Sequence, residues 1–241
     1  MLKIEHLTKK YGNRAVVDDL SLEIKPGEIC AFIGHNGAGK TTTLKSVAGI
    51  LSFDGGKIFI GGKSITEDPV GCKKMMAYLP DNPDLYDFLS GAKYLNFIAD
   101  VFGVDETARR DRIDKYAKMF EIYDSLGEKI ADYSHGMKQK LALISALIHE
   151  PKLILMDEPF VGLDPLAAHQ LKETMHEMCK GGAAVFFSTH VLDVAEKLCD
   201  KVAIIKNGKL IASGSMADIK GDESLESVFL ELSEETVSAA E

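Results

Sequence analysis

Basic residues are too few and too dispersed to form a positively charged block. The 241-residue sequence has 28 lysines and arginines against 37 acids, and its formal net charge is −9. Nucleic-acid-binding proteins use a basic face to replace the counterions of phosphate groups, so we expect no nucleic-acid partner. Cysteine is also sparse: Cys30, Cys72, Cys179 and Cys199 form no C-x-x-C pair. This spacing indicates neither a zinc site nor a disulfide framework, but buried thiols in a reducing compartment.

Long apolar runs are absent as well. No stretch reaches the roughly 18 to 20 apolar residues that a membrane-spanning helix needs, and the opening MLKIEHLTKK has no apolar signal-peptide region. We therefore expect a soluble protein that reaches a membrane only through a partner. No internal repeat or low-complexity linker divides the chain, so residues 1–241 are expected to form one domain with an insert.

Apolar patterning predicts the order of strands and helices. Leu20, Leu22 and Ile24 alternate with polar residues, which predicts antiparallel strands, followed by a buried strand at EICAFI and one short strand across GGKIFIGGKSI. From about residue 83 to 120 the spacing becomes helical, and we place a helical insert at about 83–150. After Pro151, apolar strands alternate with helices, which favours a mostly parallel sheet.

The C-terminal third has two further local signals. Asn207-Gly208 predicts a hairpin between VAIIK and KLIAS, and a C-terminal helical tail is expected over about 215–241. An apolar stripe in that tail is expected to pack on its own domain, with a partner surface as the alternative. The sequence thus predicts an α/β fold with a mostly parallel sheet, an N-terminal antiparallel β subdomain and an inserted α-helical subdomain.

A glycine-rich loop follows the strand at EICAFI. The stretch GHNGAGKTT matches G-x-x-x-x-G-K-[ST] through Gly34, Gly39, Lys40 and Thr41, and it opens a predicted helix. Such a loop turns backbone N–H groups inward around phosphate oxygens, and the helix N-terminus adds partial positive charge. We expect Lys40 to reach the β- and γ-phosphates of ATP and the Thr41 hydroxyl to ligate Mg²⁺. The other nucleotide-binding candidates in the loop are His35, Asn36, Gly37, Ala38 and Thr42.

Polar residues end two of the later apolar strands. Asp157 follows LILM at the carboxyl edge of a predicted sheet, where it is expected to hold the magnesium shell. Successive strand residues point opposite ways, so we expect Glu158 to act instead on the water that attacks the γ-phosphate. His190 follows AVFFST and is expected to sense that phosphate. Taken singly, Glu158 is also compatible with a salt-bridged acid and His190 with a structural histidine.

The order of the motifs carries a family resemblance. The chain shows YGNRAVVDDLSLEI, GHNGAGKTT, YLPD, YSHGMKQK, LILMDEP, VGLDP and STH. This series resembles the nucleotide-binding domain of ATP-binding cassette (ABC) ATPases over almost the whole chain. The resemblance implies a P-loop NTPase core in which two subunits meet head to tail around two MgATP. It also implies that Tyr11 stacks on adenine and places Val16 among the nucleotide-binding residues.

The resemblance further implies that YSHGMKQK serves the nucleotide of the opposing subunit. Ser134 and the backbone N–H groups near Gly136, at the start of the helix MKQKLALISALI, are expected to cover its γ-phosphate in trans. Asp164 of VGLDP is expected at the same dimer interface. Lys138 and Lys140 are expected on solvated or partner-facing helix positions rather than on ATP.

Two departures from the family pattern matter: one in the signature loop YSHGM, which also loses the glutamine amide at Met137, and one in YLPD. His135 replaces the first glycine of the family's L-S-G-G-Q, which predicts a mild pH dependence of closure on ATP. Asp81 of YLPD stands where the family has a glutamine; it remains a candidate magnesium ligand, although its shorter reach and added charge put direct contact in question. Together, this acid and the Y-S-x-G-M signature resemble the ATPase subunits of bacterial export permeases more than those of importers.

The implied function is that of an ATPase subunit of a membrane ABC transporter, with export as the preferred direction. It implies a second ATPase subunit, identical or paralogous, and integral membrane permease subunits that meet the helical insert and the groove near Asp81. The expected location is the cytoplasm, peripheral on the inner face of the cell membrane. A soluble ABC ATPase of a non-transport process, such as iron–sulfur cluster assembly, is the alternative, and a nucleotide-gated binding module is a third class.

Overall fold

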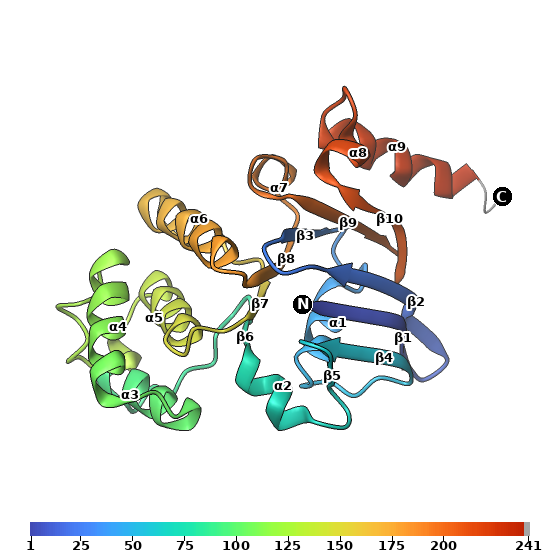
Figure 1. The fold of residues 1–241 in the computed structure, drawn as a ribbon. Helices are drawn as coiled ribbons and strands as arrows, with labels where there is room; N and C mark the ends of the chain where they lie inside the picture. Colours follow the sequence, from blue (N-terminus) through green and yellow to red (C-terminus); the bar gives the residue numbers. More distant parts are fainter. Residues whose placement is uncertain (239–241) are drawn as a thin grey trace.

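The computed structural model describes residues 1–238, and Figure 1 shows that two sheets organise the chain. The first sheet is antiparallel, with strand order β2-β1-β4-β5. Its strands are β1 (Leu2–Tyr11), β2 (Arg14–Ile24), β4 (Gly55–Ile60) and β5 (Lys63–Ser64). The single strand predicted across GGKIFIGGKSI is wrong, because Gly61 and Gly62 turn the chain and pair Lys63 with Ile60.

The second sheet has six strands in the order β10-β9-β3-β8-β7-β6. They are β3 (Ile29–Ile33), β6 (Met76–Leu79), β7 (Leu153–Asp157), β8 (Ala184–Thr189), β9 (Lys201–Lys206) and β10 (Lys209–Ser215). All neighbours are parallel except β9 and β10, which the Asn207-Gly208 hairpin joins as predicted. Every residue of β3, β7 and β8 is buried, as in a parallel sheet covered on both faces.

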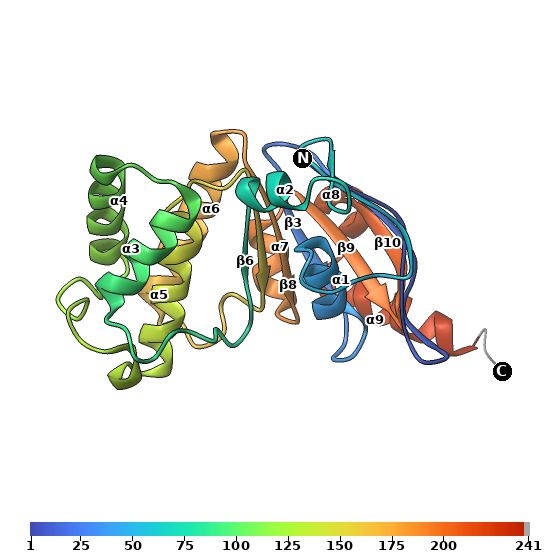
Figure 2. The ribbon, with the colours of Figure 1, turned by 90° about the horizontal axis from the view of Figure 1, so that it is seen from below.

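Helices cover both faces of the parallel sheet. The helix α1 (Lys40–Val47) lies between the two sheets, where Leu44 and Val47 join a core that also holds Phe32 of β3 and Phe186 of β8. Figure 2 shows α6 (Pro165–Lys180) and α7 (Leu192–Leu198) on the other side of the sheet. The short helix α2 (Pro69–Met75) leads into β6.

A helical lobe stands beside β6. It comprises α3 (Gly91–Phe102), α4 (Glu106–Met119), the 3-10 turn η1 (Ile130–Asp132) and α5 (His135–Leu147). The helical pattern expected from about residue 83 begins only at Gly91, because Ser90 is the N-cap of α3 and accepts the Lys93 N–H at 3.3 Å. The buried faces of α3, α4 and α5 share one continuous core with β7 and β8.

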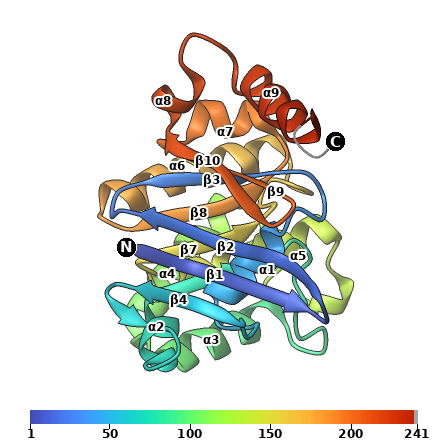
Figure 3. The same cartoon turned by 90° about the vertical axis from the view of Figure 1, so that its right-hand side faces the viewer.

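The C-terminal helices pack on α7 and β10 (Figure 3). They are α8 (Met216–Lys220), capped by Ser215, and α9 (Leu225–Ser238). Leu225 is buried, and Phe229 and Leu232 pack against the core, so the apolar stripe does cover its own domain. Residues 239–241 of the predicted tail lie outside the described residues. The four cysteines are buried, as expected.

Candidate nucleotide-binding site

The glycine-rich loop connects β3 to α1, in the strand–loop–helix context that the motif requires. Gly39 has a φ of +111°, and a Cβ there would lie 2.6 Å from the backbone carbonyl oxygen of Val16. A Cβ on Gly34 would lie 2.4 Å from the carbonyl oxygen of Ile205. The surrounding strands therefore leave no room for side chains at these positions, and the loop backbone itself faces the cavity above it.

A cavity of about 440 Å³ opens over this loop. It is in the size range of small-ligand sites. The predicted residues that line it are Val16, His35, Asn36, Gly37, Gly39, Lys40, Thr41, Thr42, Asp81, Asp157 and Glu158. Lys45, Tyr78, Pro80 and Asn82 also line it and were not predicted. Tyr11, Gly34, Ala38 and His190 are not in its lining.

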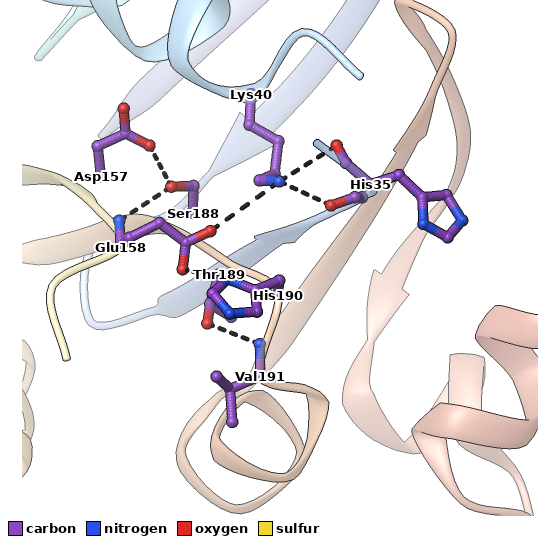
Figure 4. Close-up of polar contacts among 9 residues, drawn as sticks. His35, Lys40, Asp157, Glu158, Ser188, Thr189, His190 and Val191 are labelled. Atoms are coloured by element: carbon purple, nitrogen blue, oxygen red, sulfur yellow. Dashed lines mark hydrogen bonds and ion pairs between the residues drawn. The ribbon is translucent and has the colours of Figure 1, made fainter. Parts of the chain in front are cut away.

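Lys40 is the buried cation of the site. Its Nζ donates to the carbonyl oxygens of Gly34 at 2.6 Å and His35 at 3.3 Å, and it lies 4.0 Å from Glu158 Oε1 (Figure 4). Burial lowers the pKa of Lys40, while the charges of Glu158 and Asp157 act in the opposite direction. The hydrogen bonds of the ammonium go to neutral carbonyls, and Glu158 lies at the limit of ion-pair distance, so a phosphate oxygen in direct contact is a stronger partner for Lys40.

Asp157 ends β7 and is oriented by Ser188 of the neighbouring strand β8. The Ser188 hydroxyl donates to Asp157 Oδ1 at 2.5 Å, and Asp157 is only 3% exposed. The same hydroxyl accepts the Glu158 N–H at 3.1 Å. Sequence reasoning missed Ser188; the parallel register that pairs it with Asp157 is the only signal that identifies it. One hydroxyl thus orders both acidic residues.

Glu158 lies just outside β7 in a left-handed backbone conformation, with φ +49°. Strand alternation was therefore the wrong reason to expect the two acids to diverge: the turn at Glu158 separates them. Such a conformation is strained for a residue with a Cβ and is common at functional sites. Hydrogen bonds from the Glu158 N–H to the Ser188 hydroxyl and carbonyl hold it in place.

The carboxylate of Glu158 joins Lys40 to His190. Its side chain is 14% exposed, and its Oε2 lies 3.0 Å from His190 Nδ1. The imidazole of His190 is 59% exposed at the end of β8. His190 also lines a smaller cavity of about 190 Å³ with the first residues of the P-loop. The structure therefore brings Lys40, Asp157, Glu158 and His190 to one edge of the sheet, which favours phosphate chemistry there.

Two tyrosines flank the site differently. Tyr11 is 54% exposed at the end of β1, with Lys9 Nζ 5.2 Å from its ring centroid, and adenine stacking on it stays a prediction. Tyr78 lines the cavity, and its buried hydroxyl has no hydrogen-bond partner within the described part of the chain. Burial raises the pKa of Tyr78, and the nearby charges of Asp157 and Asp81 raise it further. The Tyr78 hydroxyl is a donor that sequence reasoning did not find.

The segment around Ser134 starts a helix and lies outside the cavity lining. Ser134 is the N-cap of α5, accepting the Met137 N–H at 3.2 Å, and the helix begins at His135, two residues before the predicted start. Ser134 and His135 are exposed, and Gly136 is partly exposed. The N-terminus of α5 is therefore open to a ligand or partner from outside this chain, and its role in trans stays a prediction.

Asp164 and Lys140 form an ion pair within the chain. Asp164 caps α6 by accepting the Ala167 N–H at 2.8 Å, and its other oxygen lies 2.6 Å from Lys140 Nζ. The lysine side chain is only 12% exposed, so the solvated alternative is wrong for Lys140, and the partner-facing one stays a prediction. Lys138 also has an internal partner, Asp87, at 2.8 Å. The pKa of Asp164 is lowered chiefly by the hydrogen bond from Lys140.

Comparison with known proteins agrees with this geometry. A family model described as "ABC transporter" matches residues 17–161. The ABC-type transporter ATP-binding protein EcsA of Bacillus subtilis (strain 168) is 37% identical over 98% of this chain and 97% of its own length. A solved structure described as the ATP binding subunit of an ABC transporter superposes with a TM-score of 0.94 and 36% identity, covering 97% of this chain and all of that one.

A second solved structure shows the same fold at lower identity. It is described as the dimeric structure of a post-hydrolysis state of the ATP-binding cassette MJ0796 bound to ADP and Pi. It matches with a TM-score of 0.82 and 21% identity over 90% of this chain and 99% of that one. The family match and the near full-length relatives support one conclusion: this chain belongs to the ABC transporter family, as an ATP-binding ATPase subunit.

Proposed function

We propose that this ATPase subunit hydrolyses MgATP at a site completed by a second ATPase subunit, and that it drives an integral membrane permease in the direction of export. The observation that carries the proposal is that Glu158, in the cavity lining, contacts both Lys40 and His190 at one edge of the sheet, while Ser134 lies outside the lining of that cavity. A γ-phosphate that is bound only by the P-loop of one subunit leaves the opposite side of that phosphate uncovered. The exposed N-terminus of α5 has the polarity to cover that side from another subunit.

The residues on hand fit a magnesium nucleotide. The hydroxyl of Thr41 and the carboxylate of Asp157 are hard oxygen donors in the cavity, and Ser188 fixes the orientation of Asp157. Asp81 lines the same cavity as a third oxygen donor. When bound, Mg²⁺ supplies charge neutralisation between the β- and γ-phosphates. Here Lys40 leaves its two carbonyl acceptors and binds the phosphate oxygens from the loop side.

Glu158 is the group placed to act on the attacking water. Its carboxylate accepts a hydrogen bond from the water and aligns its oxygen with the γ-phosphate. His190 contacts the same carboxylate and lies near the first P-loop residues, so it links the γ-phosphate end of the site to α7. Loss of the γ-phosphate removes contacts on both faces of the dimer, which favours its opening.

The composite site is tested with Glu158→Gln. This substitution keeps the shape of residue 158 but removes its charge, so ATP is expected to bind without turnover and to hold two subunits together. Size-exclusion chromatography with saturating MgATP is then expected to show a dimer, and Ser134→Trp in the same background to restore the monomer. A Glu158→Gln protein that stays monomeric with ATP bound contradicts a site shared between two copies of this chain. If Lys40→Ala turns over ATP at the wild-type rate, the P-loop assignment is wrong.

The permease partner is supported by an apolar groove on the helical lobe. A cavity of about 340 Å³ lies between α3, α5 and β6, lined by Ile50, Tyr78, Tyr94, Ile98 and Phe102 among others. Beside it, Tyr86 contacts the rings of Tyr94, Phe88 and Phe97, and Phe88 is 77% exposed. Exposed aromatic clusters of this kind mark contact surfaces. No helix among residues 1–238 has the length and apolar character to cross a bilayer.

We place the protein on the cytoplasmic face of the cell membrane, held there by the permease at this groove. Phe88→Glu is expected to abolish copurification with the permease subunits while leaving the basal ATPase rate unchanged, because Phe88 lies outside the nucleotide cavity. Val70→Glu, 64% exposed on α2, serves as the control for added surface charge. Retention of the permease by the Phe88→Glu protein contradicts this docking site. The direction of export rests on the acid at position 81 and the Y-S-x-G-M signature, and transport into inverted membrane vesicles tests it.

A further inference from the structure

The C-terminal helix α9 is fixed to α7, the helix that follows His190. The N–H of Leu225, the first residue of α9, donates to Glu196 Oε2 of α7 at 2.9 Å. Lys220, at the end of α8, donates to the other oxygen of this carboxylate at 2.5 Å. Leu225 is fully buried. Figure 3 shows α9 beside α7, so one glutamate of α7 sets where the C-terminal helix begins.

One turn into α9, Phe229 reaches the P-loop. The ring centroids of Phe229 and His35 are 5.0 Å apart, with an interplanar angle of 52°. This is within the range of attractive aromatic pairs. Figure 4 shows the imidazole of His35 turned away from Lys40 and Glu158. The C-terminal helix therefore packs on the side of the P-loop opposite to its buried lysine.

The contact closes one wall of the smaller cavity, of about 190 Å³. Its lining comprises Gly34, His35, Asn36, His190, Leu192 and Phe229. Among the residues that line this space, the two large apolar side chains are Leu192 of α7 and Phe229 of α9. Phe229 is the larger of these two side chains, and its ring is the one that pairs with His35.

The packed segment is also the segment that positions Lys40. The carbonyl oxygens of Gly34 and His35 accept the Lys40 ammonium at 2.6 and 3.3 Å. A ring held at His35 restrains the backbone of the same residue, and with it the cradle into which phosphate binds. A loop ordered before binding loses less conformational entropy when the ligand arrives.

We propose that Phe229 is a positioning residue: by packing on His35, helix α9 preorganises the P-loop and sets its affinity for nucleotide phosphates. This role rests on the nucleotide-binding function proposed above. It assigns to the C-terminal helix a part in the site that no motif of the sequence indicates. Because both ATP and ADP occupy the P-loop, Phe229 is expected to act on both nucleotides alike.

The test compares Phe229→Ala with Leu230→Ala, an exposed neighbour on the same helix. Fluorescent ATP and ADP analogues are titrated into each purified full-length protein. In Phe229→Ala, the Kd for both analogues and the KM for ATP are expected to rise about 3- to 10-fold, the range of an aromatic pair. The kcat is expected to stay within about twofold, since uniform binding is lost rather than transition-state contacts. Leu230→Ala and the ring-conserving Phe229→Tyr are expected to bind as the wild type does.

A double-mutant cycle with His35→Ala separates positioning from general stability. If Phe229 acts through His35, the double variant binds no more weakly than His35→Ala alone. Additive losses, an equal loss in Leu230→Ala, or wild-type affinity in a folded Phe229→Ala protein each overturn the proposal. Phe229→Leu, expected to shift affinity in the same direction, replaces the alanine variant if that protein unfolds. A wild-type protein that fails to bind the ATP analogue refutes the proposed function itself.

Discussion

Ser188→Ala removes a single hydroxyl that orders both acids of the site. That hydroxyl donates to the nearly buried Asp157 carboxylate at 2.5 Å and accepts the Glu158 N–H at 3.1 Å. A hydrogen bond to a charged group contributes about 1.5–3 kcal/mol, and here its loss leaves a buried carboxylate without its donor. We expect the free energy of unfolding to fall by that amount. Because the carboxylate is also expected to hold Mg²⁺, ATPase activity is expected to fall about 10- to 100-fold.

Urea unfolding and the Mg²⁺ dependence of ATP hydrolysis measure the two effects separately. Ser46→Ala is the matched control, since Ser46 is also fully buried but donates only to a neutral carbonyl, that of Thr42, at 2.8 Å. In Ser46→Ala the free energy of unfolding is expected to fall by about 1 kcal/mol, with little change in the Mg²⁺ requirement of ATP hydrolysis. The reasoning fails if Ser188→Ala keeps both wild-type stability and the wild-type Mg²⁺ requirement, or if the two serine variants behave alike.

Two further outcomes are expected. Gly39→Ala is expected to lose about 1–3 kcal/mol of stability and most nucleotide binding, because φ is +111° and the new Cβ meets a strand carbonyl at 2.6 Å. Gly127→Ala, with open space around it, is the control, and equal losses by urea unfolding refute the steric reason. Lys140 lowers the pKa of Asp164, so at a pH above the ordinary carboxyl pKa the pair contributes its full stabilisation to the fold. This contribution is lost as the pH falls through the lowered pKa of Asp164. Urea unfolding from about pH 6 to 2 is expected to show that the free energy of unfolding falls less in Lys140→Met than in the wild-type protein. The same pH profile in both proteins contradicts this.

Elements with their own start and stop signals were predictable from the sequence. The helix α6 spans Pro165–Lys180, and both start signals are local: Asp164 supplies the N-cap and Pro165 suits the first turn. Likewise, β9 ends at Lys206, where Asn207-Gly208 turns the chain. The P-loop motif likewise follows an apolar strand and precedes a helix in the sequence, so its position between β3 and α1 was predictable. In these segments, the residues that determine the structure are neighbours in the sequence.

Contacts between distant segments were not predictable. From the sequence, Lys140 is expected at a solvated or partner-facing helix position, but the fold brings Asp164, the N-cap of α6, within 2.6 Å of it. Tyr78 is the first residue of the YLPD motif, and no local pattern indicates that it lines the nucleotide cavity. Phe229 reads as one position of an apolar stripe, and only the path of α9 places it on His35. Each of these roles depends on how separate elements pack, which local periodicity does not encode.

The two acids of DEP show how packing assigns chemistry to adjacent residues. Asp157 is the last residue of a buried strand, so its carboxylate is held by the neighbouring strand at Ser188. Glu158 leaves the strand in a left-handed conformation that its own Cβ disfavours. The bonds from its N–H to the Ser188 hydroxyl and carbonyl offset that strain and direct its carboxylate between Lys40 and His190. The register between β7 and β8 therefore separates an expected metal ligand from an expected base, although the two residues are adjacent in the chain.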